Sequence, residues 1–247
     1  MNKASSIAMK VESAVAVASL FLLAAVPLLE IILRSVFRAG IPSGTSYLAH
    51  LVLIIAYLGG MVTSRTDSHL SVGGNVIPAN IGRDKRIMRT FSGTIAFSMA
   101  WAQLFTSIAW VVLAFVGTPA VGIVPIRFFA AVLPLSFGIM ALRFWRHIPS
   151  VTGRKVATIG FLIGIALAIP SIVNVIDFYY FEFLDGYAPD WLFSMTDGWY
   201  SAMRIIAIPA IVILIVSAFT GTPLFIVLGG TAFLLFSRST GSLEVIT

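Results

Sequence analysis

Residues 13–33 read SAVAVASLFLLAAVPLLEIIL, an apolar run in which Glu30 is the single charged side chain. A helix needs about 20 apolar residues to cross the hydrocarbon core of a bilayer. The run is too long for the apolar region of a signal peptide, and no small-residue cleavage motif closes it. Because Lys3 and Lys10 precede it, we interpret it as a retained signal-anchor helix.

The composition places the rest of the chain in a membrane as well. Of the 247 residues, 59% are hydrophobic and 11% are charged, with a mean hydropathy of +1.01. Soluble domains are nearer one quarter charged. Cysteine is absent, which excludes disulfides and thiolate metal sites, and three histidines are too few for most His-based metal centres.

Further apolar segments follow the first. They span 45–63, 91–116, 121–142, 156–176, about 202–219, and 223–236. The last is short enough to be a partial or tilted segment. We therefore predict an all-α, polytopic transmembrane protein of about seven hydrophobic helices.

The basic residues predict the orientation. The N-terminal tail and the segments 64–90 and 143–155 hold two, five and four of the 16 Lys and Arg residues. The segment 177–198 carries acidic residues and no basic one, and Arg34 and Arg38 are exceptions on its side. The positive-inside rule then puts the N-terminus in the cytoplasm and 177–198 outside. The net charge of +6 is explained by this clustering, so we predict no nucleic-acid partner.

Two segments outside the apolar runs carry patterns of their own. Residues 177–198 are rich in aromatic side chains, which fits either an interfacial belt or a docking surface for a periplasmic partner. The docking candidates are Asp185, Asp190 and Trp191. Residues 64–90 are basic and partly apolar, and we expect them to lie on the inner leaflet in two short pieces.

Charged and small residues at the helix ends are candidate contacts with other helices, subunits or lipids. Glu30 and Arg34 share a helix face, either as a pair near the headgroups or as a contact to a neighbouring helix. We expect Arg65 and His69 to mark the cytoplasmic boundary and Arg127 to snorkel or to bind a lipid phosphate. The full set is Glu30, Arg34, Gly59, Arg65, His69 and Arg127. No nucleotide-binding, hydrolase or metalloprotease motif is present, so we predict no catalytic residue and no enzyme.

Several of these motifs also occur in the order of a known family. They are LEIILRSVF at 29–37, Leu58-Gly59-Gly60, Arg65, His69-Leu70-Ser71-Val72, Pro78, the basic 83–89, Ile123-Val124-Pro125 and Leu133-Pro134-Leu135. Together, over residues 12–147, they resemble the small membrane subunit of TRAP (tripartite ATP-independent periplasmic) transporters. Thr45 and Ser46 stand where the family usually carries an acidic pair, and Gly73 where it often has an acidic residue.

The resemblance also implies how the chain is divided. Residues 205–236 look like the opening of the large membrane subunit of the same transporters. We therefore expect a small-subunit-like scaffold in 1–150, a connector helix and periplasmic loop in 151–200, and the start of a large-subunit-like domain in 201–247.

By resemblance, the complete system is a symporter of the bacterial inner membrane that imports organic anions, commonly carboxylates, with a sodium gradient. The implied partners are the large subunit, a periplasmic substrate-binding protein and lipids. No cofactor is expected, and sodium would bind outside this chain. Two alternatives stay open: the small subunit of a tripartite tricarboxylate transporter, and a membrane assembly protein unrelated to transport.

Overall fold

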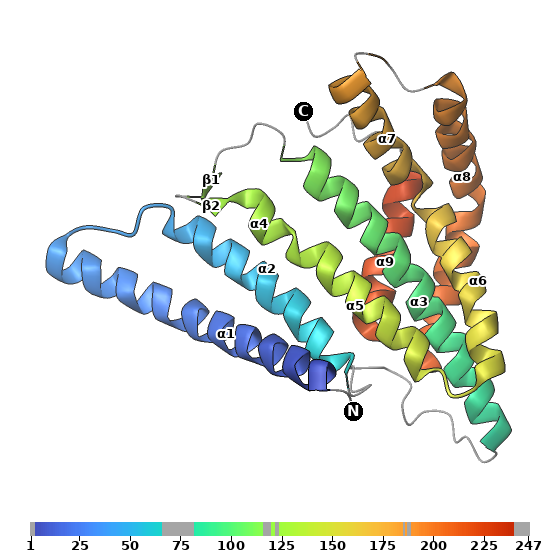
Figure 1. The fold of residues 1–247 in the computed structure, drawn as a ribbon, viewed down its shortest axis with the longest axis horizontal. Helices are drawn as coiled ribbons and strands as arrows, with labels where there is room; N and C mark the ends of the chain where they lie inside the picture. Colours follow the sequence, from blue (N-terminus) through green and yellow to red (C-terminus); the bar gives the residue numbers. More distant parts are fainter. Residues whose placement is uncertain are drawn as a thin grey trace.

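The computed structural model describes residues 3–65, 82–115, 120–121, 124–184, 186 and 189–239. Most of these residues are helical, and the strands among them form one small antiparallel hairpin, which confirms the predicted all-α class. The elements are α1 Lys3–Phe37, α2 Gly44–Thr63, α3 Gly82–Leu113, β1 Ala120–Val121, β2 Val124–Pro125, α4 Ile126–Ala130, α5 Val132–His147, α6 Val151–Leu167, α7 Ile169–Leu184, α8 Asp190–Phe219 and α9 Leu224–Ser239 (Figure 1).

Among the described residues, five helical stretches are long and apolar enough to cross a membrane. They are Met9–Phe37, Gly44–Thr63, Arg86–Leu113, Ile126–His147 and Asp190–Phe219. Helices α6 and α7 would add a sixth span if the bent pair counts as one, while α9 is shorter, at 16 residues. The multi-pass helical character is thus supported, and the count of seven and the cytoplasmic N-terminus stay predictions.

Helix α3 is the centre of the bundle and packs against α5, α6, α7, α8 and α9. Its approach to α6 is close because α6 presents glycines there. A Cβ added at Gly164 would lie 2.7 Å from Cβ of Trp101 and 2.8 Å from the carbonyl oxygen of Ser98. Small residues that let backbones approach are the usual basis of helix association in lipid.

Helices α1 and α2 form a hairpin at one side of the molecule (Figure 1). Helix α1 packs on α2, and α2 packs on α5, where a Cβ at Gly60 would lie 3.3 Å from the sulfur of Met140. Much of α1 faces outward with large apolar side chains such as Phe21 and Phe37, which are 71% and 69% exposed. Such a surface is stable in lipid and not in water.

The predicted single helix 156–176 is wrong: α6 and α7 meet at Ala168 with a bend of 55°. The cause is Pro170, which has no N–H to donate to the carbonyl four residues earlier. That carbonyl belongs to Ala166, and it accepts a hydrogen bond of 2.6 Å from Nε1 of Trp199 in α8. The bend therefore has a partner for the backbone oxygen that it frees.

The predicted outer loop 177–198 is also largely helical. Helix α7 continues to Leu184, and α8 begins at Asp190 directly after Pro189. The acidic and aromatic residues of this segment carry no helix-breaking property, and Asp190 is favourable in the first turn of a helix. The connection between the two helices is therefore much shorter than predicted.

Other predicted boundaries between helices and loops also differ from the observed ones. The predicted loop 143–155 shrinks to residues 148–150, because α5 continues to His147 and α6 starts at Val151. The predicted fourth helix, 121–142, is present with shifted bounds: the strand pair takes up its start, and α4 and α5 together form the span Ile126–His147. Most of the 64–90 segment lies outside the described residues, and its last part belongs to α3.

Helices α8 and α9 are joined by a tight turn. Gly221 has a φ of +104°, and the N–H of Thr222 donates to the carbonyl of Ser217 at 3.1 Å. This is the usual glycine-based end of a helix, and Pro223 then precedes the next one. The two helices consequently run antiparallel and side by side.

Candidate functional site

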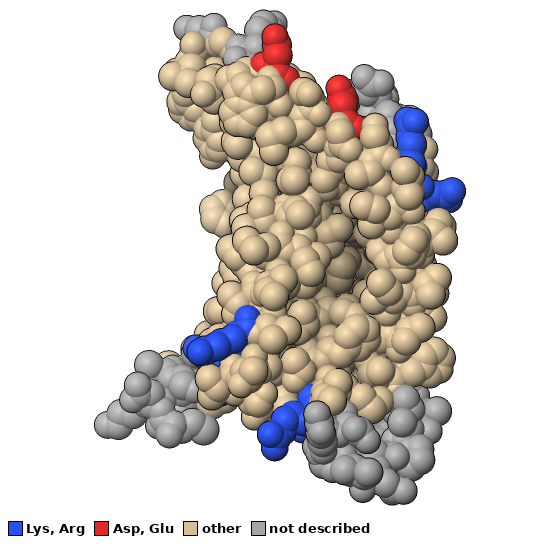
Figure 2. Space-filling model, turned by 90° about the vertical axis from the view of Figure 1, so that its right-hand side faces the viewer, with Lys and Arg blue, Asp and Glu red and all other residues tan. Residues whose placement is uncertain are grey.

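The charged side chains gather at the two ends of the bundle. We call the end with the close of α5 and the start of α6 the basic end, and the end with the close of α7 and the start of α8 the acidic end. In Figure 2 the acidic side chains in view lie at the top, the basic ones at the bottom and the upper right, with a broad uncharged middle.

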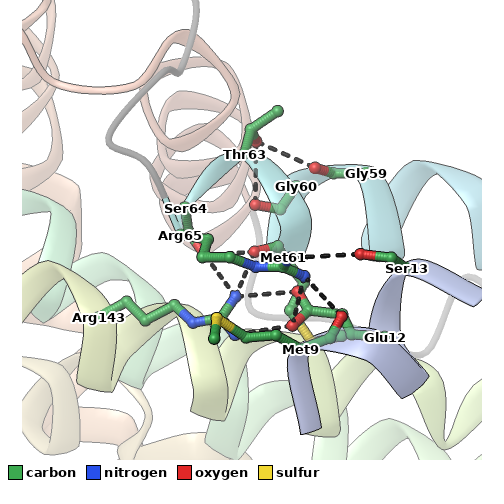
Figure 3. A network of polar contacts seen from close by, with 10 residues as sticks. All are labelled: Met9, Glu12, Ser13, Gly59, Gly60, Met61, Thr63, Ser64, Arg65 and Arg143. Carbon is green, nitrogen blue, oxygen red and sulfur yellow. Dashed lines mark hydrogen bonds and ion pairs between the residues drawn. The ribbon is translucent and has the colours of Figure 1, made fainter. Parts of the chain in front are cut away.

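A buried carboxylate at the basic end is the centre of a polar network that joins several of the described helices (Figure 3). Glu12 of α1 has a side chain that is only 6% exposed. Its Oε1 and Oε2 accept hydrogen bonds of 2.9 and 2.8 Å from Nη1 and Nη2 of Arg143 in α5. Nη2 of Arg65, just after α2, lies 3.0 Å from the same Oε2. The Arg143 contact is bidentate, which is the strongest form of this pair.

The two guanidinium groups also reach the backbone and hydroxyls around Glu12. Arg65 donates from Nη1 to Oγ of Ser13 at 3.2 Å and from Nη2 to the carbonyl of Met9 at 3.3 Å. Arg143 donates from Nη1 to Oγ of Ser64 at 3.2 Å and to the carbonyl of Met61. The network, which we call the Glu12 network, thus joins α1, α5 and the end of α2.

The end of α2 explains why these donors converge there. The last carbonyls of a helix have no partner inside it and must be satisfied from outside. Thr63 donates from Oγ1 to the carbonyls of Gly59 and Gly60 at 3.0 Å each, and the fully buried Ser64 donates to Met61 at 2.6 Å. Arg143 adds a second donor to Met61, so the end of α2 is closed by side chains.

The contacts of the Glu12 network hold helices together. Both carboxylate oxygens are engaged by guanidinium groups, so neither is left free to receive a substrate group. The two arginines exceed the carboxylate by one formal positive charge. Nε of Arg65 is buried without a hydrogen-bond partner among the residues described. A buried charge that loses its partner in such a setting is strongly destabilising.

The predicted pair of Glu30 and Arg34 is present at the opposite end of α1. Nε and Nη2 of Arg34 donate to Oε1 of Glu30 at 3.1 and 2.6 Å. The side chain of Arg34 is 69% exposed and that of Glu30 is 15% exposed. The other oxygen of Glu30 would lie 3.0 Å from a Cβ at Gly44, the first residue of α2. The intrahelical pair therefore also touches a neighbouring helix.

The other predicted contact residues are scattered. Gly59 has nothing within 4 Å of an added Cβ, and Gly60 makes the close approach to α5 instead. Arg127 is exposed on α4, and Trp191 is 61% exposed at the start of α8 beside Asp190. His69 and Asp185 lie outside the described residues. The roles proposed for these residues stay predictions.

Sequence reasoning placed Arg65 in the candidate set and missed Glu12 and Arg143. Glu12 directly precedes the apolar run 13–33 and lies outside the segments from which the candidates were chosen. The available signal was a lone carboxylate at the end of a membrane helix, on the side of the protein where the basic segments gather. That signal indicates a pairing but not which of the basic residues is the partner.

The motifs behind the TRAP resemblance fall at helix ends and contacts. Segment 29–37 closes α1, Gly59 and Gly60 lie near the end of α2, and Leu133-Pro134-Leu135 lies in the first turn of α5. Their arrangement is compatible with the resemblance but does not test it. Compared with protein-family models, curated proteins and solved structures, the chain matches none of them.

Proposed function

We propose that this chain is a membrane scaffold component of a TRAP-type secondary transporter, which imports organic anions with a sodium gradient and a periplasmic binding protein. The observation that carries the scaffold role is the Glu12 network, in which one carboxylate and two arginines attach α1 to α2 and α5. The transporter class is supported by the order of the sequence motifs between residues 12 and 147.

Charge is expensive inside a bilayer, and proteins that place it there use it for transport or for assembly. The buried carboxylate of this chain is fully engaged by cations of the same chain. Its function is thus to fix α1, whose outward face is apolar. A helix held in this way offers a permanent apolar surface to lipids or to a partner subunit.

Substrate and sodium sites belong, in this proposal, to the large subunit. Transporter ion sites are built from broken helices near the midplane of the bilayer, where unpaired backbone carbonyls face the ion. The bend between α6 and α7 does free a carbonyl, but Trp199 occupies it. The turn at 220–223 closes a hairpin at the end of α8. Neither break is arranged as half of an ion site.

The test is reconstitution. We expect the purified chain in proteoliposomes to show no sodium-dependent uptake of organic acids, even with a binding protein supplied. Adding the large-subunit sequence should give a complex that co-purifies and restores uptake. Sodium-driven uptake by the chain alone would contradict the scaffold role.

The membrane protein that co-purifies with the chain distinguishes the three candidate functions. Isolation of the chain from its native membrane with a TRAP-type large subunit supports the proposal. Isolation with the large subunit of a tripartite tricarboxylate transporter, or with a membrane protein that transports nothing, would replace it. The variant Glu12→Gln should lower recovery of the complex, because α1 loses its attachment to α5.

A further inference from the structure

A hollow of about 780 Å³ lies on the surface between α8 and α9. It is lined by Arg204 of α8 and by Ala232, Leu235, Phe236, Arg238 and Ser239 of α9. No carboxylate is among these lining residues. Neither arginine makes a hydrogen bond or ion pair with any residue in the part of the chain that the structure describes.

The two arginines come to the same level for a geometric reason. Arg204 precedes the end of α8 at Phe219 by 15 residues, and Arg238 follows the start of α9 at Leu224 by 14 residues. At a rise of about 1.5 Å per residue, both lie roughly 21–22 Å from the turn that joins the helices. Two cations from two helices therefore meet at one height in the outer part of the hairpin.

The thickness of the hydrocarbon core, measured from the turn at 220–223, puts the edge of a bilayer near that height. Helix α2 has 20 residues and spans about 30 Å, the thickness of the hydrocarbon core. Counted from the turn at 220–223, the same distance along α8 ends near Trp199 and Tyr200. The arginines lie about 8–9 Å below that level, a distance that a long side chain covers by snorkelling to the headgroups.

The polar and apolar parts of the hollow are segregated along α9. Arg238 and Ser239 end the helix, whereas Ala232, Leu235 and Phe236 come earlier in it, nearer the turn at 220–223. Leu235 and Phe236 are 47% and 56% exposed. The hydroxyl of Ser239 donates to the carbonyl of Phe236, which leaves the guanidinium groups as the charged donors. Cations above an apolar floor fit a ligand with an anionic head and a hydrocarbon tail.

We propose that this hollow binds the phosphodiester headgroup of an anionic phospholipid, with an acyl chain along Leu235 and Phe236. Arginine is suited to phosphate because its planar fork donates two hydrogen bonds at once. A net-anionic lipid is preferred over a zwitterionic one, since the hollow holds two positive charges and no carboxylate. The site does not depend on the proposed transport role.

The experiment is native mass spectrometry of the full chain in neutral detergent, titrated with phosphatidylglycerol. Arg204→Gln and Arg238→Gln should each weaken the binding about tenfold, the effect of losing one charge-assisted hydrogen bond. Arg146→Gln is the matched control, because that exposed arginine lies in the last turn of α5, outside the hollow, and it should change nothing. Ala232→Trp should also weaken binding by filling the apolar floor.

Competition identifies the source of the phosphate. Glycerol phosphate should fail to displace the lipid at equal concentration, and phosphatidylcholine should bind several-fold more weakly. Displacement by glycerol phosphate would mean a soluble anion site, and equal binding of the two lipids would mean no charge preference, so either result overturns the proposal. Unchanged binding in both arginine variants, with unchanged thermal midpoints, would also overturn it.

Discussion

The carboxylate of Glu12 accepts two parallel hydrogen bonds from the guanidinium group of Arg143, at 2.9 and 2.8 Å, although 131 residues separate them in the chain. This contact crosses from the first helix to the fifth and bypasses α2, which lies between them in sequence. Arg65 approaches the same carboxylate from the end of α2. Three helices consequently depend on one acidic side chain.

Glu12→Gln should destabilise the protein by about 3–5 kcal/mol, the usual result of leaving buried charges without their partner. The triple change of Glu12→Leu, Arg65→Met and Arg143→Met should recover part of the loss, since no uncompensated charge remains. The measurement is the free energy of unfolding in mixed detergent micelles. Arg34→Gln is the control: its exposed side chain should cost less than about 1 kcal/mol. Equal losses in Glu12→Gln and Arg34→Gln would show that the Glu12 network is solvated.

Trp199→Phe should cost about 0.5–1.5 kcal/mol, the usual net contribution of a hydrogen bond, because the carbonyl of Ala166 would lose its donor. The same change at Trp191, which is 61% exposed, should cost no more than about 0.5 kcal/mol. Thermal unfolding of the two variants in one detergent makes the comparison. A silent Trp199→Phe would mean that water or another donor reaches the bend.

Gly164→Ala should destabilise the contact between α3 and α6 by about 1–3 kcal/mol, since the added methyl meets Trp101 and the backbone of Ser98. Gly198→Ala is the matched helical control with nothing within 4 Å of the new Cβ. That control should be stabilising by about 0.5–1 kcal/mol, the gain in helix propensity. A stabilising Gly164→Ala would contradict the close packing of the two helices.

The orientation is tested by single cysteines, which are unique because the chain has none of its own. Ser150→Cys lies at the basic end, at the start of α6, and should resist an impermeant thiol reagent in intact spheroplasts. Ala188→Cys, which lies outside the described residues and two positions before Asp190 in the sequence, should react. Reaction at Ser150 together with protection at Ala188 would reverse the predicted topology.

Hydropathy predicted the helices well because lipid imposes a minimum length on each apolar run. The predicted segment 45–63 and the observed α2 differ by one residue at the start. The wrong predictions concern helix bends and helix ends in polar segments, about which the length and hydropathy of a segment give no information. Pro170 inside the apolar run 156–176 was a readable warning of a bend, whereas the continuation of α7 and α8 into the acidic segment depends on helix propensity in a polar sequence.

The candidate site was less accessible to sequence reasoning than the fold. The pair of Glu30 and Arg34 could be predicted because four residues separate its members on one helix. The pair of Glu12 and Arg143 could not, since it depends on which of several basic residues the packing of α1, α2 and α5 brings near. The periodicity of a sequence predicts which residues share a face of one helix, but it does not predict which residues of two different helices lie close together.

The hydrogen bond from Nε1 of Trp199 to the carbonyl of Ala166 connects α8 to the bend between α6 and α7 and stabilises the angle of that bend. Without a donor to this carbonyl, the angle between α6 and α7 would vary, and water or lipid headgroups would exchange as hydrogen-bond partners at the bend. Here the indole of a third helix fixes the angle, so α6, α7 and the upper part of α8 should move as one body. A rearrangement of this part of the bundle relative to its neighbours would then be absorbed at the short connections around residues 148–150 and 220–223.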